Sequence, residues 1–233
     1  MKKTVCVIIP AYNEAQIIRK VIVESRKVFD ASPYNVDIVI VNDGSKDTTA
    51  SESTKAGAFV INHILNSGAG GATATGLSYA MHRNYDAAAT MDADGQHNPQ
   101  DVVRGFDELF KSGNDLLIGS RLIDSTGMSK VKVLGNKGLS LITHVLFGIN
   151  ATDSQSGLRI FSQQALKSLR WETSGYEFCS EMLWRAHQLR LGIDEFPIKA
   201  IYTEYSKGKG QSNWNAINIV KSLLKRRIME ILE

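Results

Sequence analysis

The segment from Met91 to His97 places carboxylates and an amide at a spacing that suits metal binding. Asp92 and Asp94 stand two residues apart after a short apolar run, and Gln96 stands two residues further on. Oxygen ligands at this spacing can converge on one hard cation, Mg²⁺ or Mn²⁺, which keeps open positions for substrate phosphates. The same residues also suit an ordinary strand-end turn, so the pattern alone leaves both interpretations open. His97, beside two carboxylates, is expected to pack or hydrogen-bond rather than to bind zinc.

Such a site needs a sheet that brings the ends of several strands together, and the first 120 residues predict one. Short apolar runs alternate with amphipathic segments: we expect strands over 5–9, 36–41, 58–61, 87–91 and 116–118, and helices over 15–29, 48–56, 71–82 and 99–111. This alternation predicts an α/β fold, a three-layer sandwich with a mostly parallel central sheet. Ligands of such sheets bind beyond the carboxyl ends of the strands, where these polar side chains stand: Tyr12, Asn13, Asp43, Asp92, Asp94 and Arg121.

The regular alternation ends after Arg121. The second half predicts a helix over 133–147, a turn over 153–157, a strand over 158–161, helices near 163–169 and 179–191, and strands over 193–196 and 198–202. A loop rich in glycine and lysine follows over 203–212, and an amphipathic helix with basic residues outside its apolar positions closes the chain. No linker or repeat divides the sequence, so we expect a single domain over residues 1–233.

Composition excludes several classes of protein. With 43% hydrophobic and 22% charged residues, the chain has an ordinary globular balance. Its two cysteines do not form a disulfide framework, which favours a reducing compartment, and its longest nearly apolar stretch, 139–149, is too short to cross a bilayer. The net charge of +3 is too small to indicate nucleic-acid binding. It hides an asymmetry, since residues 1–120 carry 11 basic and 14 acidic side chains and residues 121–233 carry 16 and 10.

Six short motifs, taken together, resemble those of a known enzyme family. They are residues 9–14 (IPAYNE), 41–45 (VNDGS), 92–97 (DADGQH), 118–121 (IGSR), 153–159 (DSQSGLR) and 184–187 (WRAH). In order and spacing they resemble the family 2 glycosyltransferases with the A-type fold. The later motifs are similar to the branch that includes dolichyl-phosphate mannose synthases and bacterial polyprenyl-phosphate glycosyltransferases. The resemblance extends from residue 5 to about residue 212.

The resemblance implies that residues 1–120 form a Rossmann-like half for the nucleotide sugar and the metal. Tyr12 would stack on the base, and Pro10 and Glu14 would shape the base and ribose pocket. Asp43 would accept hydrogen bonds from the base, although a role as a turn and helix-cap residue is equally good chemistry. The metal, Mg²⁺ or Mn²⁺, and the sugar diphosphate would be held by three side chains: Asp92, Asp94 and Gln96. Residues 66–71 (NSGAGG) could also offer backbone N–H groups to a phosphate.

Residues 121–212 would be the acceptor half. Arg121 and Arg159 would contact phosphate, and Lys207 and Lys209 would bring positive charge to the diphosphate. With Asp94, both arginines and Asp153 form the expected catalytic set. The family pattern puts a general base at Asp153, but a polyprenyl phosphate is already ionised and needs no strong base. With that acceptor, Asp153 would instead orient Arg159 or the acceptor.

The resemblance implies a metal-dependent, inverting transfer from a UDP- or GDP-linked sugar to a polyprenyl (dolichyl or undecaprenyl) phosphate at the cytoplasmic membrane face, in cell-surface glycan synthesis. Several relatives continue into transmembrane helices, whereas this chain ends after the helix expected over 213–233. That helix would pack on the domain, on a second copy or on a small membrane-protein partner, or would touch anionic lipid. Two alternatives stay open: transfer to a glycan hydroxyl, and nucleotide-sugar binding without turnover. A nucleotidyltransferase is disfavoured because its glycine-rich basic signature after the first strand is missing.

Overall fold

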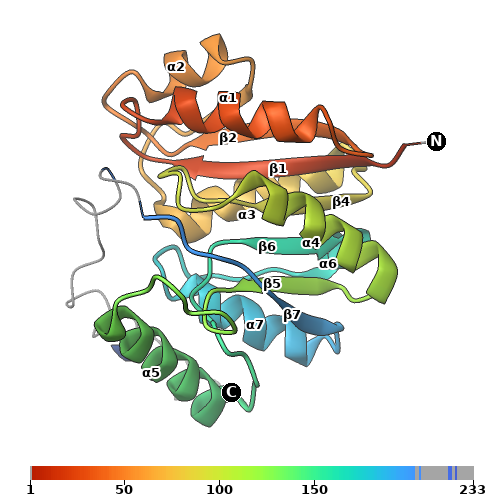
Figure 1. Ribbon diagram of the computed structural model, residues 1–233, viewed down its shortest axis with the longest axis vertical. Helices are drawn as coiled ribbons and strands as arrows, with labels where there is room; N and C mark the ends of the chain where they lie inside the picture. Colours follow the sequence, from red (N-terminus) through yellow and green to blue (C-terminus); the bar gives the residue numbers. More distant parts are fainter. Residues whose placement is uncertain (1, 203–204, 206–219, 222–223, 225–233) are drawn as a thin grey trace.

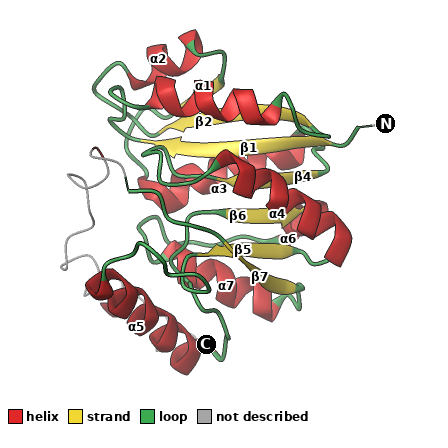
Figure 2. Cartoon of the chain, viewed as in Figure 1, coloured by secondary structure: helices red, strands yellow, loops and turns green. Residues whose placement is uncertain are grey.

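A seven-stranded sheet lies at the centre of the protein, whose computed structural model describes residues 2–202, 205, 220–221 and 224. The strands lie in the order β3-β2-β1-β4-β6-β5-β7, and all run parallel except β6 (Figures 1 and 2). The parallel strands therefore end at one edge of the sheet, termed the carboxyl edge. The strand bounds are β1 Thr4–Ala11, β2 Asn35–Asn42, β3 Phe59–Asn62, β4 Ala87–Thr90, β5 Leu116–Ser120, β6 Arg159–Ser162 and β7 Ile193–Pro197.

Helices cover both faces of this sheet. In Figure 1, α1 and α4 lie in front of the strands and α3, α6 and α7 lie behind them, whereas α5 lies apart, at the lower left. Phe147 at the end of α5 packs against Trp184 of α7, with ring centroids 5.7 Å apart. The helix bounds are α1 Ile18–Phe29, α2 Thr49–Lys55, α3 Gly68–His82, α4 Pro99–Ser112, α5 Lys130–Phe147, α6 Gln163–Ser168 and α7 Phe178–Gln188.

Local sequence signals explain where the helices begin and end. Asn98 caps α4 by accepting a hydrogen bond from the backbone of Gln100, and Gly113 ends the helix in the left-handed conformation. Ser129 caps the start of α5 in the same way, and Gly148 ends that helix in the left-handed conformation. These caps set the lengths of the two helices without help from distant residues.

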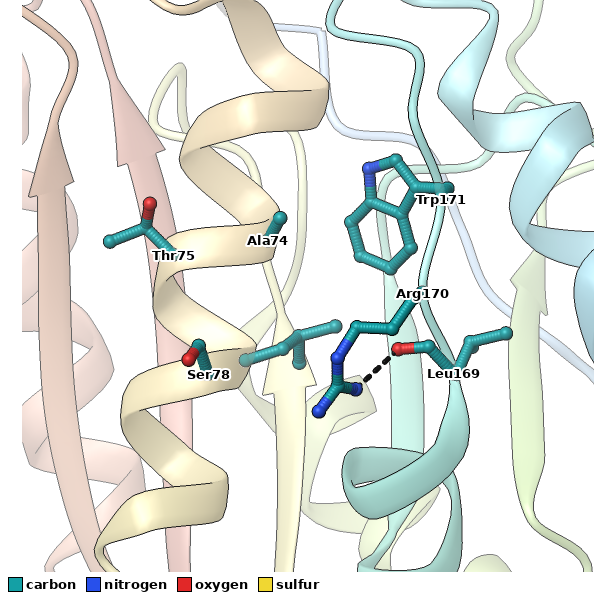
Figure 3. A pocket seen from close by; sticks show the side chains of 7 residues that line it. Ala74, Thr75, Ser78, Leu169, Arg170 and Trp171 are labelled. Atoms are coloured by element: carbon teal, nitrogen blue, oxygen red, sulfur yellow. Dashed lines mark hydrogen bonds between the residues drawn. The ribbon is translucent and has the colours of Figure 1, made fainter.

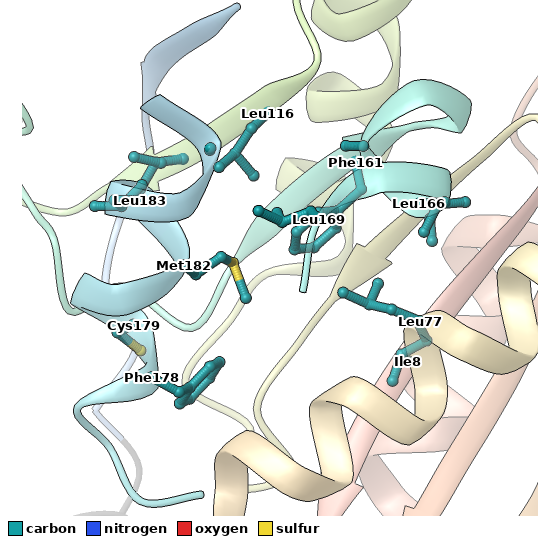
Figure 4. Close-up of a cluster of buried hydrophobic side chains, with 14 of the residues drawn as sticks. Ile8, Leu77, Leu116, Phe161, Leu166, Leu169, Phe178, Cys179, Met182 and Leu183 are labelled. Carbon is teal, nitrogen blue, oxygen red and sulfur yellow. The ribbon is translucent and has the colours of Figure 1, made fainter. Parts of the chain in front are cut away.

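Two hydrophobic clusters, one on each face of the sheet, form the core. Alternate residues of β1 supply both: Cys6 and Ile8 face one cluster, and Val5, Val7 and Ile9 face the other. Figure 4 shows the first cluster, where side chains from α3, α6 and α7 meet those of β5 and β6: Leu77, Leu116, Phe161, Leu166, Met182 and Leu183. Burial on both faces explains why the strands read as continuous apolar runs.

The structure confirms the predicted α/β architecture with a mostly parallel sheet. Every strand and helix expected in the first 120 residues is present, with ends displaced by at most three residues. The strand expected over 198–202 is wrong. After β7, Ile198 donates one further hydrogen bond to the Ser120 carbonyl, and Ile201 then donates to the carbonyl of Gln96, so the chain crosses toward the turn after β4.

Part of the prediction lies outside the described residues. This applies to Lys207 and Lys209, to nearly all of the loop over 203–212, and to most of the terminal helix expected over 213–233. Within the described part of the chain, no helix combines the length and the apolar character that crossing a bilayer requires.

Candidate active site

The carboxyl edge brings together most of the polar side chains singled out in the sequence. Parallel strands end side by side there, so segments that are distant in the chain become neighbours. Tyr12 and Glu14 follow β1, Asp43 follows β2, Asp92 and Asp94 follow β4, and Arg121 follows β5.

The turn after β4 holds its two carboxylates in a hydrogen-bond network. His97 Nε2 lies 2.9 Å from Asp92 Oδ2, and Gln96 donates to Asp94 from its backbone N–H at 3.0 Å and from its side-chain amide at 2.5 Å. His97 is buried, which confirms its expected hydrogen-bonding role, whereas 51% of the Asp92 side chain is exposed. Gln96 turns its amide nitrogen toward Asp94, and its predicted role as a metal ligand stays a prediction.

The pKa values of Asp92 and Asp94 are displaced in opposite directions. Desolvation by neighbouring groups raises the pKa of Asp92. The charge and hydrogen bond of His97, together with the charges of Arg121 and Arg159, outweigh this effect, so the pKa of Asp92 is lowered. Burial and the negative charge of Asp92 raise the pKa of Asp94. Two repelling carboxylates are stabilised by a cation placed between them, so this pair fits a divalent ion. Within the described residues, no cluster of three or more His, Cys, Asp or Glu side chains offers a complete metal site.

Gly157 lies directly against the Asp92 carboxylate. A Cβ atom at position 157 would fall 2.7 Å from Asp92 Oδ2 and closer still to Oδ1, nearer than real Cβ atoms approach. Thr90, the last residue of β4, fixes this arrangement by donating from its hydroxyl to the Gly157 carbonyl at 2.7 Å. Asp92 therefore lies between Gly157 and His97, and a side chain at position 157 would displace its carboxylate.

Arg121 is held by a buried ion pair with Asp153. Its Nε lies 2.7 Å from Oδ2 and its Nη2 lies 2.9 Å from Oδ1, while its backbone N–H donates to Oδ2 at 3.1 Å. The side chain of Asp153 is fully buried, whereas that of Arg121 keeps 18% of its surface exposed. Burial alone would lower the pKa of Arg121, but the hydrogen bond and charge of Asp153 raise it, so the guanidinium stays cationic.

Glu195 of β7 fixes the other side of Asp153. Its carboxylate accepts hydrogen bonds from the backbone N–H groups of Thr152, at 2.9 and 3.0 Å, and of Asp153, at 3.2 Å. Both oxygens of Asp153 are engaged by Arg121, so this carboxylate anchors an arginine. The arginine that Asp153 orients is therefore Arg121 and not Arg159, as one alternative had it, while a role in orienting the acceptor stays a prediction.

Arg159 is fully buried in β6, so the predicted phosphate contact is corrected. Its guanidinium donates to three carbonyl oxygens within the chain, at 2.7 to 3.1 Å: those of Ser154, Ser156 and Cys179. A phosphate contact would require breaking these hydrogen bonds in the core. Arg159 instead fixes the turn over 153–157, which carries Asp153 and Gly157.

The residues after β1 form the side of the site predicted to hold the nucleotide. The Tyr12 side chain is 42% exposed, which leaves its ring accessible for stacking, and Pro10 lies partly buried near the end of β1. Glu14 accepts a hydrogen bond from the Tyr205 hydroxyl at 2.6 Å, which places Tyr205 close to the segment that follows β1. The predicted contacts of these residues with a nucleotide stay predictions.

Asp43 is buried and serves as a cap. Its carboxylate accepts hydrogen bonds from the backbone N–H groups of Ser67 and Gly68 and lies 2.8 Å from His63 Nδ1. Burial raises the pKa of Asp43, but these hydrogen bonds together lower it. The helix-cap alternative is thus confirmed, for α3, while its contact with a base stays a prediction. Because the N–H groups of Ser67, Gly68 and Gly70 have partners within the chain, the glycine segment over 66–71 does not present them to a phosphate.

Two grooves open elsewhere on the described surface, each of about 390 Å³. The groove in Figure 3 lies between α3 and the segment after α6, where Arg170 donates to the Leu169 carbonyl and Trp171 forms one wall. The second groove lies between α5 and residues 150–152. Its lining includes Leu122 and Thr152, which are the sequence neighbours of Arg121 and Asp153. None of the four residues after β4 that form the carboxylate network lines either groove.

Sequence reasoning missed several residues of this site. Glu195 carried a signal, since two adjacent carboxylates inside an expected strand need polar partners. Gly157 and His63 carried none, because their contacts join segments far apart in the chain. Tyr176 is half-exposed, and desolvation and the negative charge of Asp92 raise its pKa. Nothing in the sequence singles out this residue.

Comparisons with known sequences show which proteins this chain is similar to. Residues 6–170 match the Glycosyl transferase family 2 domain. The chain is 39% identical to the UDP-N-acetylglucosamine–dolichyl-phosphate N-acetylglucosaminyltransferase of Methanococcus voltae, over 99% of each chain. It is 31% identical to the undecaprenyl-phosphate mannosyltransferase of Micrococcus luteus, over 88% of this chain and 86% of that one.

Comparisons with solved structures support the fold. Glucosyl-3-phosphoglycerate synthase from Mycobacterium tuberculosis superposes with a TM-score of 0.73 at 20% identity, over 97% of this chain and 80% of that one. The same enzyme in complex with Mn²⁺, UDP-glucose and phosphoglyceric acid superposes with a TM-score of 0.71 at 21% identity, with the same coverage.

Proposed function

Because this chain belongs to glycosyl transferase family 2, we propose that it is a metal-dependent, inverting enzyme that moves a sugar from a nucleoside diphosphate sugar to a polyprenyl phosphate. The observation that best supports a phosphate acceptor is the Arg121–Asp153 ion pair. Two relatives that match most of the chain are named for dolichyl- and undecaprenyl-phosphate acceptors.

The ion pair favours a phosphate acceptor over a hydroxyl acceptor. A hydroxyl needs a general base within hydrogen-bond reach, whereas a phosphate is already ionised near neutral pH. Asp153 stands where the family pattern puts that base, but it is fully buried and both its oxygens are bound to Arg121. An arginine anchored in this way presents a fixed positive charge, which suits a phosphate oxygen.

On the donor side, Asp92 and Asp94 would hold Mg²⁺ or Mn²⁺. A structural neighbour is known with Mn²⁺ and UDP-glucose bound, and the Asp92 side chain is half-exposed and fixed by His97. The ion would stabilise the negative charge that grows on the departing diphosphate. Tyr12 would stack on the base, with Pro10 and Glu14 around the ribose, and Lys207 and Lys209 would approach the diphosphate.

Sugar transfer tests the proposal directly. The enzyme is incubated with UDP- and GDP-sugars, Mn²⁺ or Mg²⁺, and either a short water-soluble polyprenyl phosphate or a glycan with free hydroxyls, and the products are identified by mass spectrometry. We expect a glycosyl phosphate product that is lost with a chelator. A product formed only on a glycan hydroxyl, or donor binding without any transfer, would refute the proposed acceptor or turnover.

Asp92→Asn serves as the catalytic control and is expected to abolish transfer while leaving the fold intact. The enzyme would act at the cytoplasmic membrane face, where a lipid-linked acceptor meets soluble nucleotide sugars. The division into a nucleotide and metal half, residues 1–120, and an acceptor half, residues 121–212, is part of the same proposal.

A further inference from the structure

The protein exposes large aliphatic side chains in two places. Ile64 and Leu65, in the turn between β3 and α3, are 97% and 78% exposed, and together they are termed the β3–α3 tip. Four residues of α5 are between 62% and 76% exposed and are termed the α5 stripe: Val131, Leu134, Leu141 and Val145. Contiguous exposed apolar side chains of this size mark interaction surfaces.

The β3–α3 tip is carried by an anchored turn. His63 Nδ1, the Ser67 N–H and the Gly68 N–H each lie 2.8 Å from an oxygen of the Asp43 carboxylate. Gly44 packs so closely under the tip that a Cβ there would lie 2.8 Å from its backbone. The chain therefore holds two aliphatic side chains out into solvent on a fixed support.

The α5 stripe lies on one face of its helix, away from the buried residues, and Leu141 at its edge also lines the groove between α5 and residues 150–152. Its members recur at helical spacing, while the buried residues of α5, among them Leu139, Thr143 and Phe147, fall on the other side. Lys130 and Lys137 stand beside the stripe in the same helix, which contains no acidic residue, whereas Lys132 lies over the Tyr202 ring, 4.4 Å from its centroid. An apolar stripe accompanied only by positive charge is the pattern of a helix that lies on an anionic lipid surface.

The two surfaces flank the candidate active site. The tip follows β3 at one side of the sheet, and α5 follows β5 near the other, so the ends of β1, β2 and β4 lie between them in the strand order. A flat partner that touched both surfaces would cover the edge of the sheet where Asp92, Asp94 and Arg121 gather.

We propose that the β3–α3 tip and the α5 stripe together dock the protein on an anionic lipid bilayer, with the candidate active site facing the lipid headgroups. The inference rests on the proposed function, because a polyprenyl phosphate acceptor holds its phosphate at that surface. A second copy of the chain fits less well, since pairing two α5 helices through their stripes would bring lysines of the same sign together.

Vesicle co-sedimentation tests this surface. Wild type is mixed with vesicles of phosphatidylcholine alone or of phosphatidylcholine with phosphatidylglycerol, and we expect binding chiefly to the anionic vesicles. Two double variants, Ile64→Ser with Leu65→Ser and Leu134→Glu with Val145→Glu, should each weaken that binding by about tenfold or more. Val23→Glu is the matched control, because Val23 is an exposed aliphatic residue of α1 (41%) outside both surfaces, and it should bind like wild type. Circular dichroism and thermal unfolding verify that all variants fold.

Several results would overturn the proposal. Wild type that does not bind anionic vesicles, a Val23→Glu loss equal to the others, or a loss confined to one double variant each contradicts docking through both surfaces. A dimer seen by light scattering that Leu134→Glu with Val145→Glu dissociates, with vesicle binding unchanged, would assign the stripe to a second copy instead.

Transfer to a short water-soluble polyprenyl phosphate separates this inference from the proposed function. Both double variants should keep wild-type activity with that acceptor, and should lose about tenfold or more with a long-chain acceptor embedded in anionic vesicles. Absence of any transfer by wild type would refute the proposed function, while the vesicle-binding results would still decide the docking surface.

Discussion

Replacing Asp153 with asparagine isolates the buried charge on Arg121. Asp153→Asn keeps the shape of the side chain but removes the charge that faces the guanidinium at 2.7 and 2.9 Å. One of the two guanidinium donors then meets an amide N–H instead of an oxygen. Only 18% of the Arg121 side chain is exposed, so water replaces the lost partner only in part.

The expected cost follows from that geometry. Removing one partner of a buried ion pair typically destabilises a protein by about 3 to 5 kcal/mol. Because the asparagine oxygen still accepts one hydrogen bond, we expect the lower end, about 3 kcal/mol. A protein of ordinary stability, about 5 to 15 kcal/mol, would stay folded. Adding Arg121→Met removes the stranded charge while the asparagine oxygen still accepts the backbone N–H of position 121. The double variant should recover most of the loss, to within about 1 kcal/mol of wild type.

Urea unfolding of wild type, Asp153→Asn and the double variant measures these differences, and the transfer assay is run in parallel. Stability should fall and then recover across the series, whereas activity should fall in the single variant and stay absent in the double variant. A single variant within about 0.5 kcal/mol of wild type would refute the reasoning, since surface substitutions cost no more than that. A double variant less stable than the single one would do the same.

Three further changes test other parts of the site. Gly157→Ala should displace the Asp92 carboxylate and weaken Mn²⁺ binding by about 10- to 100-fold in calorimetry, whereas Gly135→Ala, where an added Cβ meets no atom within 4 Å, should leave it unchanged. Because the pKa of Asp43 is lowered below 3.8 in the folded protein, its stabilising contribution is complete above that pH and is lost as the pH falls through the lowered value. Wild type should therefore lose more stability than Asp43→Asn between about pH 7 and about pH 3 in urea unfolding, and equal losses would count against the cap. Chelation should stop sugar transfer and Mn²⁺ should restore it; transfer that persists without metal would remove Asp92 and Asp94 from the proposed metal site.

Local patterns accounted for most of the architecture. The apolar runs of β1 and β2, the Asn98 cap with Pro99, and the glycine that ends α4 are readable because each depends on neighbours within a few residues. The strand expected over 198–202 was wrong for the opposite reason. Its apolar residues suit a strand, but the backbone of Ile201 finds its hydrogen-bond partner at Gln96 rather than beside β7.

The sequence also marked most of the candidate site, since polar residues after buried strands meet at one edge of a parallel sheet. It did not assign their partners correctly. The sequence predicted a phosphate contact for both Arg121 and Arg159. In the structure, Asp153 holds Arg121 at the carboxyl edge, whereas Arg159 is buried in the core and donates to carbonyl oxygens. The difference depends on the turn over 153–157 folding back over β6, which is a long-range contact.

By itself, the sequence determined the α/β class, the strands and helices of the first half, the Asp92 and Asp94 turn and the family. Each follows from periodicity, short-range hydrogen bonding or motifs of a few residues. Only the tertiary structure decided that Asp153 anchors Arg121, that Gly157 lies against Asp92, that Asp43 caps α3, and that exposed aliphatic side chains flank the carboxyl edge. Those outcomes depend on burial and on contacts between segments many residues apart, which no local pattern in a single chain encodes.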